Sequence, residues 1–289
     1  MVSRRARCAS LTLDVRERRE RVSLRDNRIA TSLLRSAVVL WYVVTVLGQL
    51  LFALYITVLY GGGAFRGDIT VLNAVMPTGY VPGDTVGNAT IFVHLALAVF
   101  IIASGALQLI PAVRRHAPWL HRRVGRTYIV AALLISVGGL YLVWVRGAVG
   151  DVTQHLASTL NASLIVSCGI IAWRAARARS FDRHRRWALR LFLSASGVWF
   201  FRVGLMLWLL IFRRPVGFDV KTFEGPFLST LAFAESIVPL AILQLYFWAQ
   251  KTTRARARVM FASLLVVLTC GIAVGILSAT MGMWLPKMR

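Results

Sequence analysis

The stretch VMFASLLVVLTCGIAVGIL, residues 259–277, decides the fold class. It carries no charged side chain, is apolar on every face, and is long enough to cross a bilayer as one helix, which takes about twenty residues. A strand of a transmembrane barrel would be shorter and would alternate between polar and apolar residues. The stretch LALAVFIIASGALQLI, residues 95–110, has the same character. The sequence therefore predicts an all-α integral membrane protein.

Composition and the lengths of the apolar runs extend this prediction. Hydrophobic residues make up 57% of the chain and the mean hydropathy is +0.67, both above the range of soluble domains. We expect seven membrane spans, at residues 33–60, 89–113, 127–145, 155–173, 190–212, 229–250 and 259–284. A basic segment, residues 1–32, would precede a transmembrane domain, residues 33–289, with a four-helix core at 89–212 and an external loop at 61–88.

The net charge of +23 is explained by membrane topology and does not require a nucleic-acid partner. Arginine gathers before the first predicted span and in the loops at 114–126, 174–190 and 251–258, while the alternate loops hold few basic residues. By the positive-inside rule, the N-terminus is cytoplasmic and the C-terminus external. Arginine outnumbers lysine, as is common in proteins of high-GC bacteria, so we expect the inner membrane of a bacterium and the lipid bilayer as a partner.

Four of the five histidines follow a pattern along the predicted core helices. His94 and His155 lie near the external ends of the second and fourth spans, whereas His121 and His184 lie near the cytoplasmic starts of the third and fifth. The separations within these two pairs are 61 and 63 residues, which predicts that one helix pair repeats as the next. Under such a parallel repeat, the members of each pair face each other across the core. His116 falls outside the pattern.

Two imidazoles on opposite helices are suited to the axial positions of a haem iron. The sequence therefore predicts one or two haem b groups and a role in transmembrane electron transfer, as an oxidoreductase of the b-type cytochrome kind. Haem propionates are carboxylates, which arginine binds in a bidentate manner at the level of the lipid headgroups. The basic residues beside the cytoplasmic histidines are candidates for this contact: Arg122, Arg126, Arg185 and Arg190. Possible electron partners are a quinone or a small redox donor or acceptor.

Two segments carry a resemblance to known families. HRRVGRTY at residues 121–128 and HRRWALR at 184–190, together with His94, Gly105 and Gln108, resemble an uncharacterised bacterial multi-pass membrane family with HRxxGRxY and HRxW signatures. The order of the helices and the placement of the four histidines also resemble the cytochrome b561 type of transmembrane dihaem cytochrome. This second resemblance implies two haem groups, each held by one histidine pair, and electron transfer across the membrane.

Further polar residues fall inside the apolar runs. An unpaired charge in the hydrocarbon core costs several kcal/mol, so the mid-span Arg202 and Glu235, whose depths differ by about 5 Å, are predicted to form a buried pair. Such a pair would clamp two helices, or it would gate or bind an anionic or quinone-like substrate. Gln108 and Asn161 are the other polar residues predicted to be buried in the core.

Each histidine also has a structural interpretation. His121 and His184 could be interfacial cations that anchor their helices beside Trp119 and Trp187, as in aromatic belts. His94 could be satisfied by a hydrogen bond to an amide side chain, Asn161 or Gln154, on the fourth span.

Two alternative functions therefore stay open. The chain could be a transporter with a polar path around Arg202 and Glu235, or a non-catalytic membrane scaffold whose basic cytoplasmic face binds acidic partners. The oligomeric state is left open.

Overall fold

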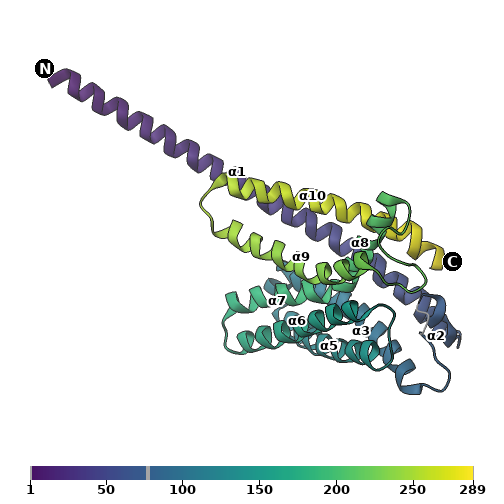
Figure 1. The fold of residues 1–289 in the computed structure, drawn as a ribbon. Coiled ribbons are helices and arrows are strands. Elements are labelled where there is room, and N and C mark those ends of the chain that lie inside the picture. Colours follow the sequence, from purple (N-terminus) through teal and green to yellow (C-terminus); the bar gives the residue numbers. More distant parts are fainter. Residues whose placement is uncertain (1, 76–78, 289) are drawn as a thin grey trace. The chain divides into compact units, whose positions relative to one another are not determined.

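The computed structural model describes residues 2–75 and 79–288, with side chains from Arg25 onward. The described chain is helical, with an isolated bridge between Asp219 and Glu224. In chain order the α-helices are α1 (Val2–Ile56), α2 (Gly62–Phe65), α3 (Thr85–Leu109), α4 (Pro111–His116), α5 (Pro118–Trp144), α6 (Val152–Arg177), α7 (Phe181–Ala195), α8 (Gly197–Phe212), α9 (Pro226–Lys251), α10 (Ala255–Ala279) and α11 (Leu285–Met288) (Figure 1). Short π-helical and 3₁₀ elements are η1 (Thr57–Gly61), η2 (Ile69–Ala74) and η3 (Thr280–Trp284).

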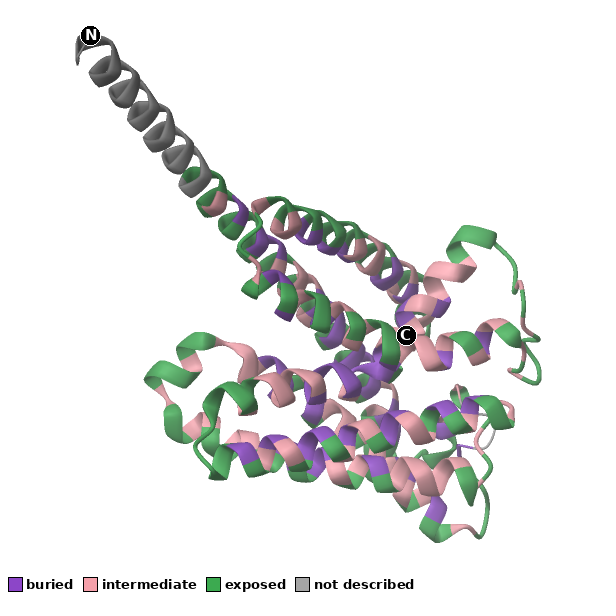
Figure 2. Ribbon diagram, turned by 60° about the vertical axis from the view of Figure 1, so that its left-hand side comes forward, coloured by how far each residue is buried: buried purple, intermediate pink, exposed green. Residues whose placement is uncertain are grey.

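The membrane spans agree with the prediction. Among the described residues, six helices are long and apolar enough to cross a bilayer, and α7 with α8 gives a seventh, bent span. Large apolar side chains such as Val93, Leu134 and Val137 are more than half exposed, as expected for helices that face lipid (Figure 2). An all-α integral membrane protein is therefore confirmed. One helix, α1, covers both the predicted basic segment and the first span.

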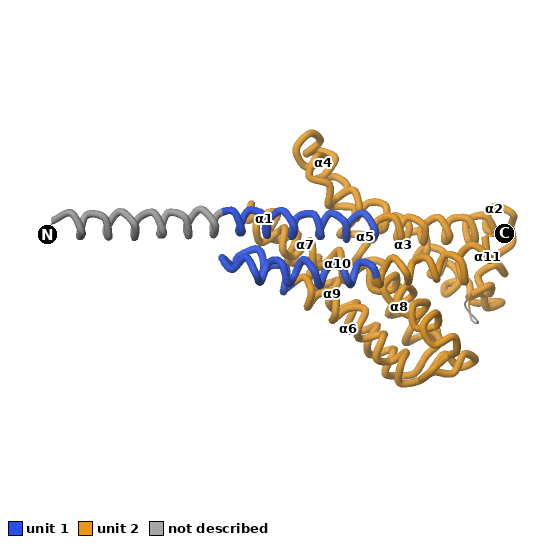
Figure 3. The backbone as a smooth tube through the Cα atoms, turned by 90° about the horizontal axis from the view of Figure 1, so that it is seen from above, with its two compact units in different colours: residues 1–44, 244–270 blue, residues 45–243, 271–289 orange. Residues whose placement is uncertain are grey.

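The chain divides into two compact units (Figure 3). The first contains residues 1–44 and 244–270, and in it Arg258 of α10 donates a hydrogen bond of 2.8 Å to Thr31 of α1. The second contains residues 45–243 and 271–289 and includes every residue of the sites described below.

The second unit holds the predicted four-helix core. Helix α3 packs on α5, α5 on α6, and α6 on α7. Their contacts include a buried apolar cluster with Ile129, Cys168 and Leu191. Gly105 of α3 allows the helices to approach closely, because a Cβ there would lie 3.1 Å from the ring of Tyr128 and 3.2 Å from that of Phe192.

A tight turn joins α6 to α7. The amide of Ser180 donates to the carbonyl of Ala175 at 2.9 Å, and the amide of Arg179 donates to Ala176 at 3.1 Å. These are the two bonds of a Schellman motif, whose left-handed position is usually glycine. Here Arg179 occupies it, with φ of 55°. The turn returns the chain at once, so that α7 begins alongside the end of α6.

The fifth span is broken, whereas the sequence predicted one uninterrupted helix over residues 190–212. Helices α7 and α8 meet at Ser196 with a bend of 49°. The hydroxyl of Ser196 donates to the carbonyl of Phe192 at 2.7 Å and accepts a bond of 2.9 Å from the amide of Gln49. Sharp bends are typical of serine and glycine neighbours, and Gly197 follows directly.

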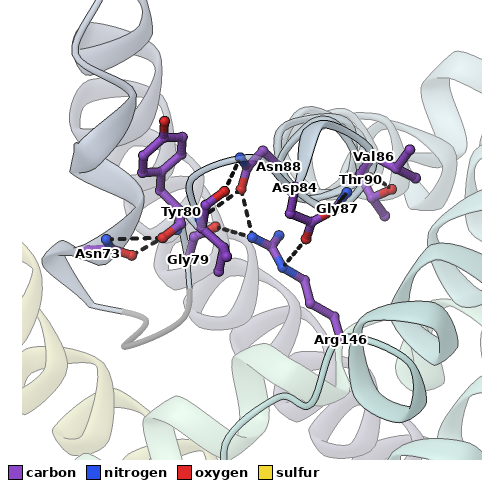
Figure 4. A network of polar contacts seen from close by, with 10 residues as sticks. Asn73, Gly79, Tyr80, Asp84, Val86, Gly87, Asn88, Thr90 and Arg146 are labelled. Atoms are coloured by element: carbon purple, nitrogen blue, oxygen red, sulfur yellow. Dashed lines mark hydrogen bonds and ion pairs between the residues drawn. The ribbon is translucent and has the colours of Figure 1, made fainter.

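The loop predicted at residues 61–88 is tied to the end of α5 by Arg146 (Figure 4). The Arg146 guanidinium lies 3.1 Å from the Asp84 carboxylate and donates to Asn88 at 2.6 Å and to the carbonyl of Gly79 at 3.2 Å. Only 6% of the Arg146 side chain is exposed. A buried charge network of this kind holds the loop against the core.

Candidate functional site

His121 and His184 occupy equivalent positions at the basic end of the core, the end formed by residues 110–126 and 174–190. Each is the fourth residue of its helix, because α5 begins at Pro118 and α7 at Phe181. Both helix starts agree with the sequence: Pro118 stands in the first turn of α5, and Ser180 is the N-cap residue of α7. The two histidines therefore occupy the same position in their helices, as the repeat in the sequence predicts.

The two histidines lie at the same end of the core. An electrostatic interaction links His121 to His184, and Arg114 and Arg122 also act on His121. The Nδ1 atom of His184 is 3.0 Å from the carbonyl oxygen of Ala172 on α6. Because a carbonyl only accepts, this Nδ1 carries the hydrogen, and in the corresponding neutral tautomer Nε2 has a free lone pair. The Nδ1 atom of His121 is buried and has no hydrogen-bond partner among the described residues.

The four predicted arginines lie at the same end of the core and differ in exposure. Arg122, Arg126 and Arg185 are exposed, whereas Arg190 is half-buried. The guanidinium of Arg190 lies 4.7 Å from the centre of the Trp187 ring. This basic end therefore offers several exposed guanidinium groups near the two histidines in the sequence.

A further polar column runs from His121 into the core, and the sequence reasoning missed part of it. The Tyr128 hydroxyl and the Nε2 atom of Gln108 are buried without a partner among the described residues. A Cβ on Gly125 would lie 3.2 Å from the Gln108 side-chain oxygen. The spacing of positions 121, 125 and 128 places them on one face of α5, a signal already present in HRRVGRTY.

His94 and His155, the other predicted pair, have different neighbours. The ring of His94 packs on α5, where a Cβ on Gly139 would lie 3.4 Å from its Cε1 atom. The Nε2 atom of His155 is 3.1 Å from the carbonyl oxygen of Ala148, and its ring meets the edge of Trp144 at a centroid distance of 5.6 Å. Within residues 2–75 and 79–288, no hydrogen bond or ring contact joins His94 to His155. The alternative, a hydrogen bond from His94 to the side-chain amide of Asn161 or Gln154, is not found among the described residues. The buried Nδ1 atom of His94 has no partner among them.

Arg202 and Glu235 lie near each other but do not form the direct ion pair that the sequence predicted. Their charges interact electrostatically, yet no ion pair joins them among the described residues. The Arg202 guanidinium instead turns back along α8 to the carbonyl of Val198 at 3.4 Å and lies 5.1 Å from the centre of the Phe52 ring. Of the other predicted polar residues, Asn161 is buried and its side-chain oxygen has no partner among the described residues.

Comparison with known proteins finds one family and no individual relative. The model of a family described as "Predicted membrane protein (DUF2306)" matches residues 91–248. No curated protein and no solved structure matches the chain. The match runs from within α3 to near the end of α9, and it confirms the resemblance to an uncharacterised multi-pass membrane family.

Proposed function

The chain belongs to the DUF2306 family of predicted membrane proteins, and from this premise we propose that it is a transmembrane electron carrier that binds one haem b between His121 and His184. The observation that carries the proposal is the placement of these two imidazoles at the same helical register and at the same end of the core. Bis-histidine ligation needs two protein ligands, which is the number that this pair supplies.

The state of the two rings fits the proposal. The hydrogen bond from His184 Nδ1 to the Ala172 carbonyl holds the ring in one tautomer and leaves Nε2 available. A histidine that ligates a metal through one ring nitrogen usually donates the N–H of the other nitrogen in this way. The buried and unpartnered Nδ1 of His121 shows that this ring, too, keeps unused hydrogen-bonding capacity. Haem, when bound, would supply one-electron redox chemistry at its iron.

Other residues of this end have roles that follow from their placement. The exposed guanidinium groups of Arg122, Arg126 and Arg185 would hold the propionate carboxylates at the membrane surface. The apolar cluster of the core excludes water from the deeper edge of the site. Tyr128 and Gln108 offer buried hydrogen-bonding groups beside it.

The proposal takes one haem, because an electrostatic interaction links His121 to His184, whereas no interaction links His94 to His155 among the described residues. It places the chain in the inner membrane of a bacterium with the basic end in the cytoplasm, which the distribution of arginine supports. The proposed electron partners are a membrane quinone or a small redox molecule.

A reduced-minus-oxidised spectrum tests the proposal. The wild-type chain is purified in detergent from haem-replete cells, and its absorbance is recorded before and after dithionite. We expect a b-type difference spectrum that is lost in His121→Ala and in His184→Ala. His116→Ala is the matched control, because His116 is exposed and lies outside the pair.

A colourless wild-type protein would overturn the proposal, and so would a spectrum that survives both substitutions. If colourless protein in liposomes also carried a solute flux that Glu235→Gln abolishes, the transporter would become the better assignment.

A further inference from the structure

The connection between the spans α3 and α5 is a short helix that presents basic side chains. Pro111 begins α4 and Pro118 begins α5, and the helical conformation is disfavoured for a residue that precedes proline. The residues before the two prolines are accordingly not helical, so α4 is set off from both spans. Figure 3 shows α4 standing to one side of the second unit. Its last turn carries Arg114 and Arg115, which therefore lie where the two spans leave the membrane.

Two further side chains of this corner come from the start of α5. Trp119 and Arg123 lie four residues apart, and the Arg123 guanidinium is 5.7 Å from the centre of the Trp119 ring. Trp119 is 55% exposed, and all three arginines are exposed as well. An exposed tryptophan beside cations is typical of the boundary between lipid headgroups and hydrocarbon. We refer to Arg114, Arg115, Trp119 and Arg123 as the corner surface.

The charges at the basic end have few carboxylates to balance them. Residues 110–126 and 174–190 contain twelve arginines and a single acidic residue, Asp182. At the opposite ends of the same spans, five basic and five acidic residues share three loops: 61–88, 146–151 and 213–225. The positive-inside rule explains why basic residues gather at one end, but acidic residues contribute little to that rule. Topology therefore does not explain why the basic end is almost free of them, whereas a role in binding anions does.

A phospholipid phosphate is the anion that fits this place. A guanidinium binds phosphate oxygens in bidentate geometry and stays charged at every physiological pH. The phosphates of the headgroups lie at the level where spans leave the bilayer, and the acyl chains below them offer apolar contact to the exposed Trp119 ring. A soluble polyanion would supply charge alone and leave this ring in water. A zwitterionic lipid would bring its own cation to the phosphate, so the surplus of arginine favours a lipid of net negative charge.

We propose that the corner surface binds the phosphate groups of anionic phospholipids, with Arg114, Arg115 and Arg123 at the phosphate and the Trp119 ring at the boundary with the acyl chains. This binding goes beyond the proposed electron transfer and does not depend on it, because none of these four residues is assigned to the haem or its propionates.

Microscale thermophoresis of the full-length chain in detergent tests the proposal. The probes are phosphatidylglycerol, phosphatidylcholine and glycerol phosphate, which share a phosphate and differ in net charge or in the presence of acyl chains. We expect phosphatidylglycerol to bind at least about tenfold more tightly than either of the others, and its binding to weaken as the salt concentration rises. Equal affinity for the two lipids would overturn the proposal. So would glycerol phosphate that binds as tightly as phosphatidylglycerol, because the ligand would then be a soluble phosphate compound.

Neutral variants locate the binding. The triple variant Arg114→Gln, Arg115→Gln, Arg123→Gln should bind phosphatidylglycerol about a hundredfold more weakly, because each basic residue near an anionic surface contributes about fivefold. The matched control neutralises three exposed arginines at the opposite end, beside acidic residues: Arg66, Arg213 and Arg214.

The control variant should bind phosphatidylglycerol as the wild-type chain does. Unchanged affinity in the folded corner variant would refute the assignment, and so would an equal loss in the two triple variants. Gel filtration and circular dichroism establish that each variant is folded, and the lipid series with its salt dependence on the wild-type chain decides the matter if one is not. A haem spectrum, present or absent in the same preparation, leaves this test unaffected.

Discussion

Replacement of Gly197 by alanine tests the close packing at the broken span. The new methyl group would lie 2.9 Å from Asn161 Nδ2, 3.0 Å from Glu235 Oε1 and 3.3 Å from its Cδ. These separations are below ordinary van der Waals contact, so both side chains must shift. Asn161 has little room to do so, because it is already buried between helices.

The size of the effect follows from two opposing contributions. Overpacking of a close-packed site costs about 1–3 kcal/mol. Alanine in place of glycine in a helix regains up to about 1 kcal/mol, through the smaller entropy of the unfolded chain. We therefore expect Gly197→Ala to lower the free energy of unfolding by about 1–2 kcal/mol. Gly271→Ala, in α10, is the matched control, since a Cβ there meets nothing within 4 Å.

The assay is reversible unfolding in mixed micelles by titration with dodecyl sulfate, followed by far-ultraviolet circular dichroism. The control variant should be as stable as the wild-type chain or slightly more stable. If Gly197→Ala proved as stable as Gly271→Ala, the close contact of Asn161 and Glu235 with the first turn of α8 would be wrong.

Three further predictions concern the loops. Arg146→Gln leaves Asp84 without its ion pair and should destabilise the protein by about 2 kcal/mol. Proteolysis at residues 66–84 should then be faster than in the wild-type chain, and equal rates would contradict the prediction. Arg179→Gly relieves the left-handed conformation of an L-residue and should raise the free energy of unfolding by about 1 kcal/mol; a loss of stability would count against the Schellman turn. Backbone amides of residues 222 and 221 donate to Asp219 and hold the pKa of its carboxyl below its usual range. That stabilisation is present above the ordinary aspartate pKa and is lost as the pH falls through the lowered one; hydrogen exchange of the two amides should show this dependence, and Asp219→Asn should remove it.

The features that the sequence predicted well are those set locally along the chain. Span lengths follow from uninterrupted apolar runs, and the start of α5 follows from Pro118, whose missing amide suits the first helical turn. The common register of His121 and His184 follows from the same kind of signal, because both helices begin three residues earlier.

The features that the sequence predicted poorly depend on how each helix is rotated about its own axis. The rise per residue gives the depth of Arg202 and Glu235, but it does not say that the guanidinium folds back onto Val198. The similar spacings of 61 and 63 residues predicted that His155 lies level with His94, but they do not predict the contact of the His155 ring with the Ala148 carbonyl. The segment SASG, residues 194–197, does contain a local signal for the bend, since sharp helix kinks are common at serine and glycine residues.

The Schellman turn between α6 and α7 has a consequence for biogenesis. It is closed by bonds between residues at most five positions apart, and the bond from His184 to Ala172 spans twelve. A nascent chain that ends after α7 therefore already contains both imidazoles and the carbonyl that orients one of them. Both ligands of the proposed haem are therefore in place before the later helices are synthesised, so the proposal predicts that haem binding does not need those helices.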